Sequence, residues 1–118
     1  MRKVPEACIK ITTDSNIKFL EKNSIIHFKN PDRLTYKRVQ VDGCALKDGL
    51  KCDNLLCSQD EHEERYVELK GADVLHAIDQ LRNSIEKLGE FTDNRHAYVV
   101  CTKVYPSYKT KIQLAQVI

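Results

Sequence analysis

The sequence predicts an α/β fold in which a mixed central β-sheet is flanked by helices, and three observations support this prediction. Residues 33–70 contain three successive stretches with the alternating pattern of strands, separated by turn residues. Residues 72–88 have the periodicity of an amphipathic helix, and residues 96–105 form a further strand with a continuous apolar centre. A strand that follows a helical crossover need not pair antiparallel with the strand before it, so the predicted sheet is mixed.

The N-terminal third leaves two interpretations open. Residues 13–23 suit either a short helix capped by Asp14 or Ser15, or a strand and turn. Residues 24–29 are expected to form a strand, which ends at an Asn-Pro-Asp sequence.

The three central strands are expected to form a meander. Residues 33–43 alternate in polarity, with a change of apolar phase near Arg38 that predicts a β-bulge. Asp48-Gly49 supplies a turn before the strand at residues 52–58, and an acidic loop leads to the third strand at residues 65–70.

The helix at residues 72–88 is the clearest element of the sequence. Gly89 follows it where a C-terminal cap is expected, and residues 108–118 suit either a terminal helix or an edge strand. The apolar positions that define the helix, spaced by three and four residues, are Val74, Leu75, Ile78, Leu81, Ile85 and Leu88.

Length and composition predict one domain, residues 1–118, in a cytoplasmic protein. No apolar run approaches the roughly 18 residues of a membrane span, and no apolar stretch follows the first basic residues as in a signal peptide. The five cysteines are odd in number and lack a CxxC pair, so we expect reduced thiols without a disulfide or bound zinc. The alternative is a zinc site made of Cys44, Cys52, Cys57 and His62.

The net charge of +2 indicates little about partners, but basic residues gather in residues 29–51 and again near the C-terminus. A segregated basic surface can meet phosphates, and solvated strand edges are the alternative. The positions expected to contact nucleic acid are Arg33, Lys37, Arg38 and Lys103.

The strand at residues 65–70 carries the candidate chemistry. Side chains alternate across a strand, so Glu68 and Lys70 share one face while Val67 and Leu69 share the other. We expect the following helix to cover the apolar face, which leaves Glu68 and Lys70 on the opposite side. If Asp53 of the preceding strand joins them, two carboxylates and one ammonium converge.

Two neighbouring carboxylates repel each other unless a cation lies between them, and Mg²⁺ prefers oxygen ligands. A lysine beside the cation can orient a water or stabilise charge that develops on a phosphate. The alternative is a cross-strand salt bridge between Lys70 and either acid.

The spacing of Asp53 and Glu68-Leu69-Lys70 on successive strands, followed at once by a helix, resembles the PD-(D/E)XK nuclease superfamily. The resemblance covers about residues 34–104 and implies a restriction-endonuclease-like core with Mg²⁺ or Mn²⁺ as cofactor and DNA as substrate. It implies that Asp53, Glu68 and the Leu69 carbonyl bind metal and that Lys70 is the catalytic lysine. Gln80 matches a glutamine that many members carry in the following helix.

The sequence departs from the superfamily pattern in three ways. Cys52 stands where proline gives the superfamily its name, and Glu21 is the only plausible match for a glutamate on a first helix. The chain also leaves little room for a DNA-specificity subdomain. We therefore expect it to dimerise, to bind a structure instead of a sequence, or to work with a protein partner.

Asp42 is either a third metal-binding carboxylate or an Asp-Gly turn residue, because folding the hairpin places it opposite Asp53. Three functions follow from the sequence. The first is a Mg²⁺-dependent DNA endonuclease. The second is a nuclease fold without catalysis that serves as a nucleic-acid-binding, accessory or immunity module. The third is an α/β binding protein unrelated to nucleases.

Overall fold

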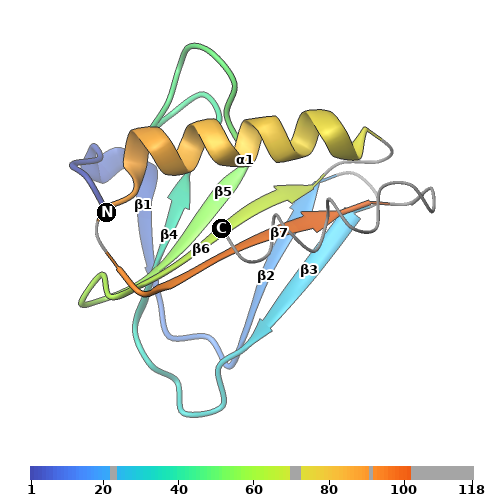
Figure 1. Ribbon diagram of the computed structural model, residues 1–118. Helices are drawn as coiled ribbons and strands as arrows, with labels where there is room; N and C mark the ends of the chain where they lie inside the picture. Colours follow the sequence, from blue (N-terminus) through green and yellow to red (C-terminus); the bar gives the residue numbers. More distant parts are fainter. Residues whose placement is uncertain (22–23, 70–72, 91, 102–118) are drawn as a thin grey trace.

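The computed structural model describes residues 1–21, 24–69, 73–90 and 92–101 (Figure 1). Within these ranges the chain forms one short 3-10 helix, seven strands and one α-helix. In order they are η1 (Glu6–Cys8), β1 (Ile9–Thr12), β2 (Asn16–Glu21), β3 (Ser24–Lys29), β4 (Tyr36–Gln40), β5 (Asn54–Ser58), β6 (Glu63–Leu69), α1 (Val74–Leu88) and β7 (Asn94–Val100).

Five of the strands form a mixed sheet with the order β1-β4-β5-β6-β7. The pairs from β1 to β6 are antiparallel, whereas β6 and β7 are parallel and are connected through α1. The predicted meander, the crossover helix and the mixed sheet are therefore confirmed. A parallel pair requires a crossover that returns the chain to the same end of the sheet, and α1 provides it.

Residues 16–21 form a strand, β2, and not the short helix that was one of the two interpretations left open by the sequence; residues 22–23 lie outside the described residues. β2 and β3 form an antiparallel hairpin in which Leu20 pairs with Ile25. Ile17 and Phe19 are buried and alternate with exposed Lys18 and Leu20, which is the pattern of a strand with one covered face.

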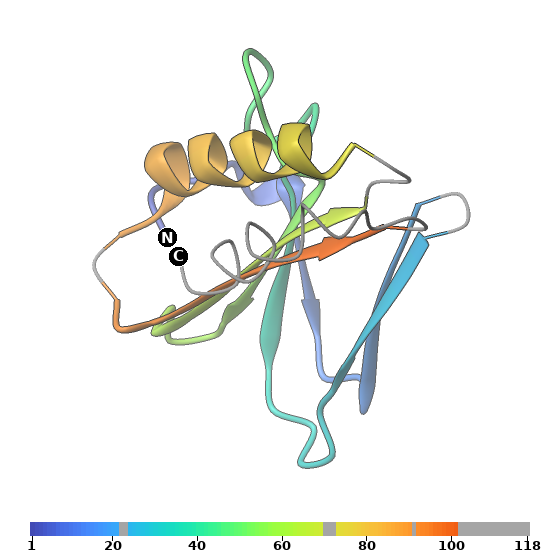
Figure 2. The ribbon, with the colours of Figure 1, turned by 45° about the vertical axis from the view of Figure 1, so that its right-hand side comes forward.

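The sheet has a covering layer on each side (Figure 2). α1 lies over one face and contacts β6 and β7, while the β2–β3 hairpin lies against the other face and contacts β7 through β3 (Figure 1). Among the described residues α1 is thus the only helix that covers the sheet, in contrast to the predicted flanking by helices.

Each face of the sheet has its own apolar core. On the helix face, Leu55 and Tyr66 pack with Leu81 of α1. On the hairpin face, Val67 and Leu69 belong to a cluster that includes residues of β2 and β3. The predicted β-bulge near Arg38 is absent, because β4 pairs with β5 in one continuous register over Tyr36–Gln40. The change of apolar phase arises because the strand packs Val39 into the core on the helix face and the partly buried Tyr36 against the cluster on the hairpin face.

The predicted orientation of β6 is therefore wrong. The apolar residues Val67 and Leu69 face the hairpin, and Tyr66 faces the helix. Glu68 lies on the same side as Tyr66 and is 2% exposed. The β2–β3 hairpin supplies the apolar surface that covers Val67 and Leu69, and α1 covers the opposite face of β6.

The expectation of five reduced cysteines is also wrong, because Cys8 and Cys44 form a disulfide. Pairing of β1 with β4 brings the end of η1 close to the turn that follows β4, with the two Cα atoms 5.6 Å apart. Cys44 is thereby unavailable for the alternative zinc site. Cys52 and Cys57 are buried thiols. Among the described residues, no helix combines the length and apolar character needed to cross a membrane.

Candidate metal and catalytic site

Asp53 lies immediately before β5, where backbone and side-chain contacts hold it between β4 and β6. Its carbonyl oxygen accepts from the amides of Val41 at 3.0 Å and Asp42 at 3.4 Å. Its carboxylate Oδ2 accepts from the backbone amide of Leu69 at 2.8 Å. The Asp53 carboxylate is therefore fixed beside the last residues of β6.

The strand register places Glu68 next to Asp53. Asn54 pairs with Val67 at the end of the antiparallel ladder, and Asp53 and Glu68 are the next residues along the two chain segments beyond that pair. The bond from the Leu69 amide to the Asp53 carboxylate shows that the two segments stay close beyond the ladder. The two acidic residues predicted from the sequence therefore lie on neighbouring segments of the chain, but Glu68 is buried on the helix side of β6 and not on the opposite face that the sequence predicts.

The Cys52 thiol lies in the field of both carboxylates. Burial raises its pKa to about 12, a hydrogen bond from Ser84 works in the opposite direction, and the negative charges of Glu68 and Asp53 raise it further. Burial therefore favours the protonated form of the Cys52 thiol, which does not suit a thiolate nucleophile.

The remaining residues of the ExK motif are only partly described. Leu69 buries its side chain on the hairpin face and commits its amide to Asp53, so its carbonyl is the backbone group that can ligate a metal. Lys70 and Lys103 lie outside the described residues.

Gln80 contacts the backbone that leads into Asp53. Its Nε2 donates to the carbonyl of Lys51 at 3.0 Å. Its Oε1 is buried and has no hydrogen-bond partner among the described residues, which leaves this oxygen available to a water or a ligand. The contact with Lys51 was not predicted from the sequence, and neither were the neighbouring contacts of Asn83 and Ser84 with residues 50 and 52.

Asp42 is both a turn residue and a neighbour of Asp53. It precedes Gly43, whose φ of +78° suits a residue without Cβ, and its amide donates to the Asp53 carbonyl. Its exposed side chain lies 3.9 Å from the Lys51 ammonium. Both interpretations of Asp42 that the sequence left open are therefore compatible with its position.

A surface hollow of about 290 Å³ joins several of these side chains. Asp53 and Asp42 line it from the sheet, and Glu21 lines it from the end of β2. Glu21 thus reaches the same region as Asp53, but from a strand and not from the helix that the resemblance implies. The other described lining residues are Leu20, Gln40 and Asn54.

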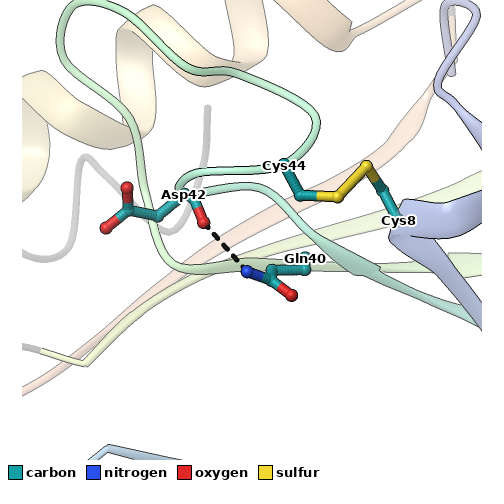
Figure 3. The surroundings of a disulfide bond; sticks show 4 residues. All are labelled: Cys8, Gln40, Asp42 and Cys44. Carbon is teal, nitrogen blue, oxygen red and sulfur yellow. Dashed lines mark hydrogen bonds between the residues drawn. A yellow bond between two sulfur atoms is a disulfide. The ribbon is translucent and has the colours of Figure 1, made fainter.

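The turn that carries Asp42 is held from two sides (Figure 3). Gln40 Nε2 donates to the Asp42 carbonyl at 3.2 Å, and Cys44 is joined to Cys8 through the disulfide. The Asp42 carboxylate points away from the disulfide (Figure 3).

The carboxylates do not close into a complete metal cage. Within the described part of the chain, no three His, Cys, Asp or Glu side chains are grouped closely enough to hold a metal ion. This arrangement differs from a dedicated protein cage such as a calcium site, whereas Mg²⁺ commonly takes one or two carboxylates and keeps several waters.

The basic residues of β4 do not form one surface, because neighbouring strand residues point to opposite faces. Lys37 forms an ion pair with Glu61, with Nζ and Oε2 3.0 Å apart. Arg38 stacks on Phe19 of the hairpin with its guanidinium carbon 4.5 Å from the ring centre. Arg33 is exposed in the turn before β4. Of the predicted phosphate contacts described here, Arg33 alone is solvent-exposed.

Sequence reasoning also missed a buried polar cluster on the helix face of β6. Glu64 is fully buried, its Oε1 accepts from Arg95 Nε at 2.9 Å, and the Tyr66 hydroxyl donates to the same oxygen at 3.2 Å. A buried carboxylate that is paired and hydrogen-bonded in this way is usually structural.

No protein-family model, curated protein or solved structure matches this chain significantly. The interpretation of the site consequently depends on its geometry and on the sequence motif.

Proposed function

We propose that this chain is a Mg²⁺-dependent phosphodiesterase that cleaves DNA. Asp53 and Glu68 would bind the metal, and Lys70 would assist the attacking water. The observation that carries the proposal is the bond from Leu69 N to Asp53 Oδ2, which fixes one acid beside the strand that bears the other.

The arrangement of elements around this contact supports a restriction-endonuclease-like core. The sequence motif resembles that of the PD-(D/E)XK superfamily, whose core runs strand, strand, strand, helix, strand. Here β4, β5, β6, α1 and β7 follow in that order over residues 36–100, with Asp53 immediately before the second of these strands and Glu68 on the third.

The donor set suits a hard divalent cation. Asp53, Glu68 and the Leu69 carbonyl offer only oxygen atoms, and water would complete the coordination of Mg²⁺ or Mn²⁺. A bound cation would also offset the repulsion between neighbouring carboxylates, which otherwise disfavours ionisation of both. Such a metal polarises a phosphoryl oxygen and lowers the pKa of bound water.

The chain's own residues supply position and charge. Asp53 is held through both its carbonyl and its carboxylate, so the direction of its carboxylate is set before a ligand arrives. Lys70, next in sequence to Leu69, would orient the water or stabilise charge on the phosphate. DNA would approach at the hollow lined by Asp42 and Asp53, and the Lys51 ammonium, 3.9 Å from the Asp42 carboxylate, would offer a cation for the DNA backbone.

One observation favours a second function, a non-catalytic nuclease fold that serves as a nucleic-acid-binding or protein-interaction module. Glu68 is only 2% exposed. A metal ion can therefore reach its carboxylate only if the surrounding residues move aside. A protein that had lost catalysis would tolerate that burial.

Cleavage and metal binding separate the two functions. We expect wild type to bind Mn²⁺ in a calorimetric titration and to cleave plasmid or branched DNA with Mg²⁺. Asp53→Asn should lose both properties, with cleavage falling about a hundredfold or more. Asp93→Asn, an exposed acid beside β7 at the opposite end of the sheet, is the matched control and should behave as wild type. If the wild-type protein does not bind metal and does not cleave any nucleic acid, the enzymatic function is refuted and the non-catalytic function remains.

A further inference from the structure

Three successive residues before Asp53 are held through their backbones by side chains of α1. Each bond joins a polar side chain of the helix to a peptide group of residues 50–52. The three bonds are Asn83 Nδ2 to the Leu50 carbonyl, Gln80 Nε2 to the Lys51 carbonyl at 3.0 Å, and the Cys52 amide to Ser84 Oγ at 2.8 Å.

The helix positions match this task. Residues three and four apart lie on the same side of an α-helix, so Gln80, Asn83 and Ser84 form one polar stripe. Residues 50–52 precede β5 and lie outside the strands, which means that the sheet does not satisfy their peptide groups. The helix therefore replaces the missing strand neighbour along this segment.

Ser84 is the central contact because both partners are fully buried. Ser84 and Cys52 are each 0% exposed. Water cannot replace the hydroxyl there, so its removal would leave the Cys52 amide unpaired in the interior. Cys52 is bonded directly to Asp53, and any shift of its peptide group moves the Asp53 backbone.

We infer that Ser84 is a positioning residue, which holds Asp53 so that its carboxylate stays bonded to the Leu69 amide, next to Glu68 in the chain. Asn83 and Gln80 support the same segment from its N-terminal side. The consequence for metal binding depends on the function proposed above, whereas the placement of Asp53 does not.

The first measurement needs no metal. In amide hydrogen exchange followed by NMR, Asp53→Ala should remove the protection of the Leu69 amide that comes from the Asp53 carboxylate. Ser84→Ala should lower that protection about tenfold or more. Ser84→Thr, which keeps a hydroxyl, should restore it at least in part. An unchanged Leu69 protection factor in Ser84→Ala would overturn the inference.

The second measurement compares Mn²⁺ affinity at a temperature where every variant is folded. Ser84→Ala should weaken Mn²⁺ binding by roughly 10–100-fold, the usual effect of losing a residue that orients a ligand. Leu88→Ala is the control, because Leu88 is the last residue of α1, one turn beyond Ser84, and packs in the same apolar core with a side chain that cannot hydrogen-bond to residues 50–52. It should lower the melting temperature without changing Mn²⁺ affinity.

The two measurements distinguish the possible failures. If wild type binds no Mn²⁺ but Ser84→Ala still exposes the Leu69 amide, the proposed function fails and the positioning role stands. If wild type binds Mn²⁺ and Ser84→Ala binds it equally well with an unchanged Leu69 amide, the positioning role fails alone. If Ser84→Ala does not fold, Asn83→Ala takes its place in both measurements, because it removes the more exposed contact with the Leu50 carbonyl.

Discussion

Reduction of the Cys8–Cys44 disulfide should lower the stability of the protein by several kcal/mol. The bond joins residues 36 apart in the sequence, and its main effect is to restrict the unfolded chain. For a closed loop of that length the chain-entropy relation gives about 4 kcal/mol at 25 °C. In a chain of this size that loss corresponds to a fall in Tm of roughly 15 °C.

The folded state should survive the reduction with local structure near Cys44 intact. The turn at residues 42–46 has backbone bonds of its own, including Leu46 N to the Val41 carbonyl at 2.9 Å and Gly43 N to the Leu46 carbonyl at 3.0 Å. The reduced protein should therefore unfold cooperatively, with a larger denaturant slope because its unfolded chain exposes more surface.

The assay is urea and thermal unfolding with and without tris(2-carboxyethyl)phosphine. The control is the double variant Cys8→Ser, Cys44→Ser, which should match the reduced wild type and ignore the reductant. Peptide mapping by mass spectrometry under non-reducing conditions identifies the linked pair. Identical unfolding curves for oxidised and reduced wild type would refute the reasoning, as would a linked pair that involves Cys52 or Cys57.

Three further predictions concern single side chains. Lys70→Ala should leave Mn²⁺ affinity nearly unchanged, because an ammonium does not ligate a cation, while plasmid cleavage falls about a hundredfold; equal losses of both would contradict this role. Arg95→Ala should cost about 2–3 kcal/mol in urea unfolding, because it removes a charged hydrogen bond from buried Glu64, and a cost near zero would show that the cluster does not depend on Arg95. Burial raises the pKa of the Cys52 thiol from its ordinary value of 9.0 to about 12, so the folded state keeps a proton that the unfolded state loses between these pH values. Its contribution to stability is fully present below pH 9 and should be lost as the pH rises from about 9 towards 12. The free energy of unfolding should therefore fall with pH in this range, and Cys52→Ala should make that fall less steep.

The elements with a regular period were predictable from the sequence. α1 has apolar residues at helical spacing and Asp73 at its start, whose carboxylate accepts from the His76 amide at 3.1 Å. The β4–β6 meander was predictable because each strand alternates and polar turns separate them. The placement of Asp53 and Glu68 on successive segments of this meander was predictable in the same way.

The features that depend on distant contacts were not predictable. Val67 and Leu69 indicated an apolar face, but the sequence could not decide between α1 and the hairpin as its cover. Strand pairing between β1 and β4 brings Cys8 to Cys44, and no local spacing signals that approach. The contact of Ser84 with Cys52 has the same origin, because a serine on a helix reveals its partner only once the helix is placed on the sheet.

A crystal structure of the protein grown with Mn²⁺ tests the central claim most directly. The proposed function predicts an anomalous difference peak from one Mn²⁺ ion. The ion should lie about 2.0–2.2 Å from one carboxylate oxygen each of Asp53 and Glu68 and from the Leu69 carbonyl oxygen, as for a small hard cation. Glu68 would have to turn from its buried position far enough to share that ion with Asp53. An ordered site without a peak at millimolar Mn²⁺, with the Asp53 carboxylate still on the Leu69 amide and Glu68 still enclosed beneath α1, would contradict the claim.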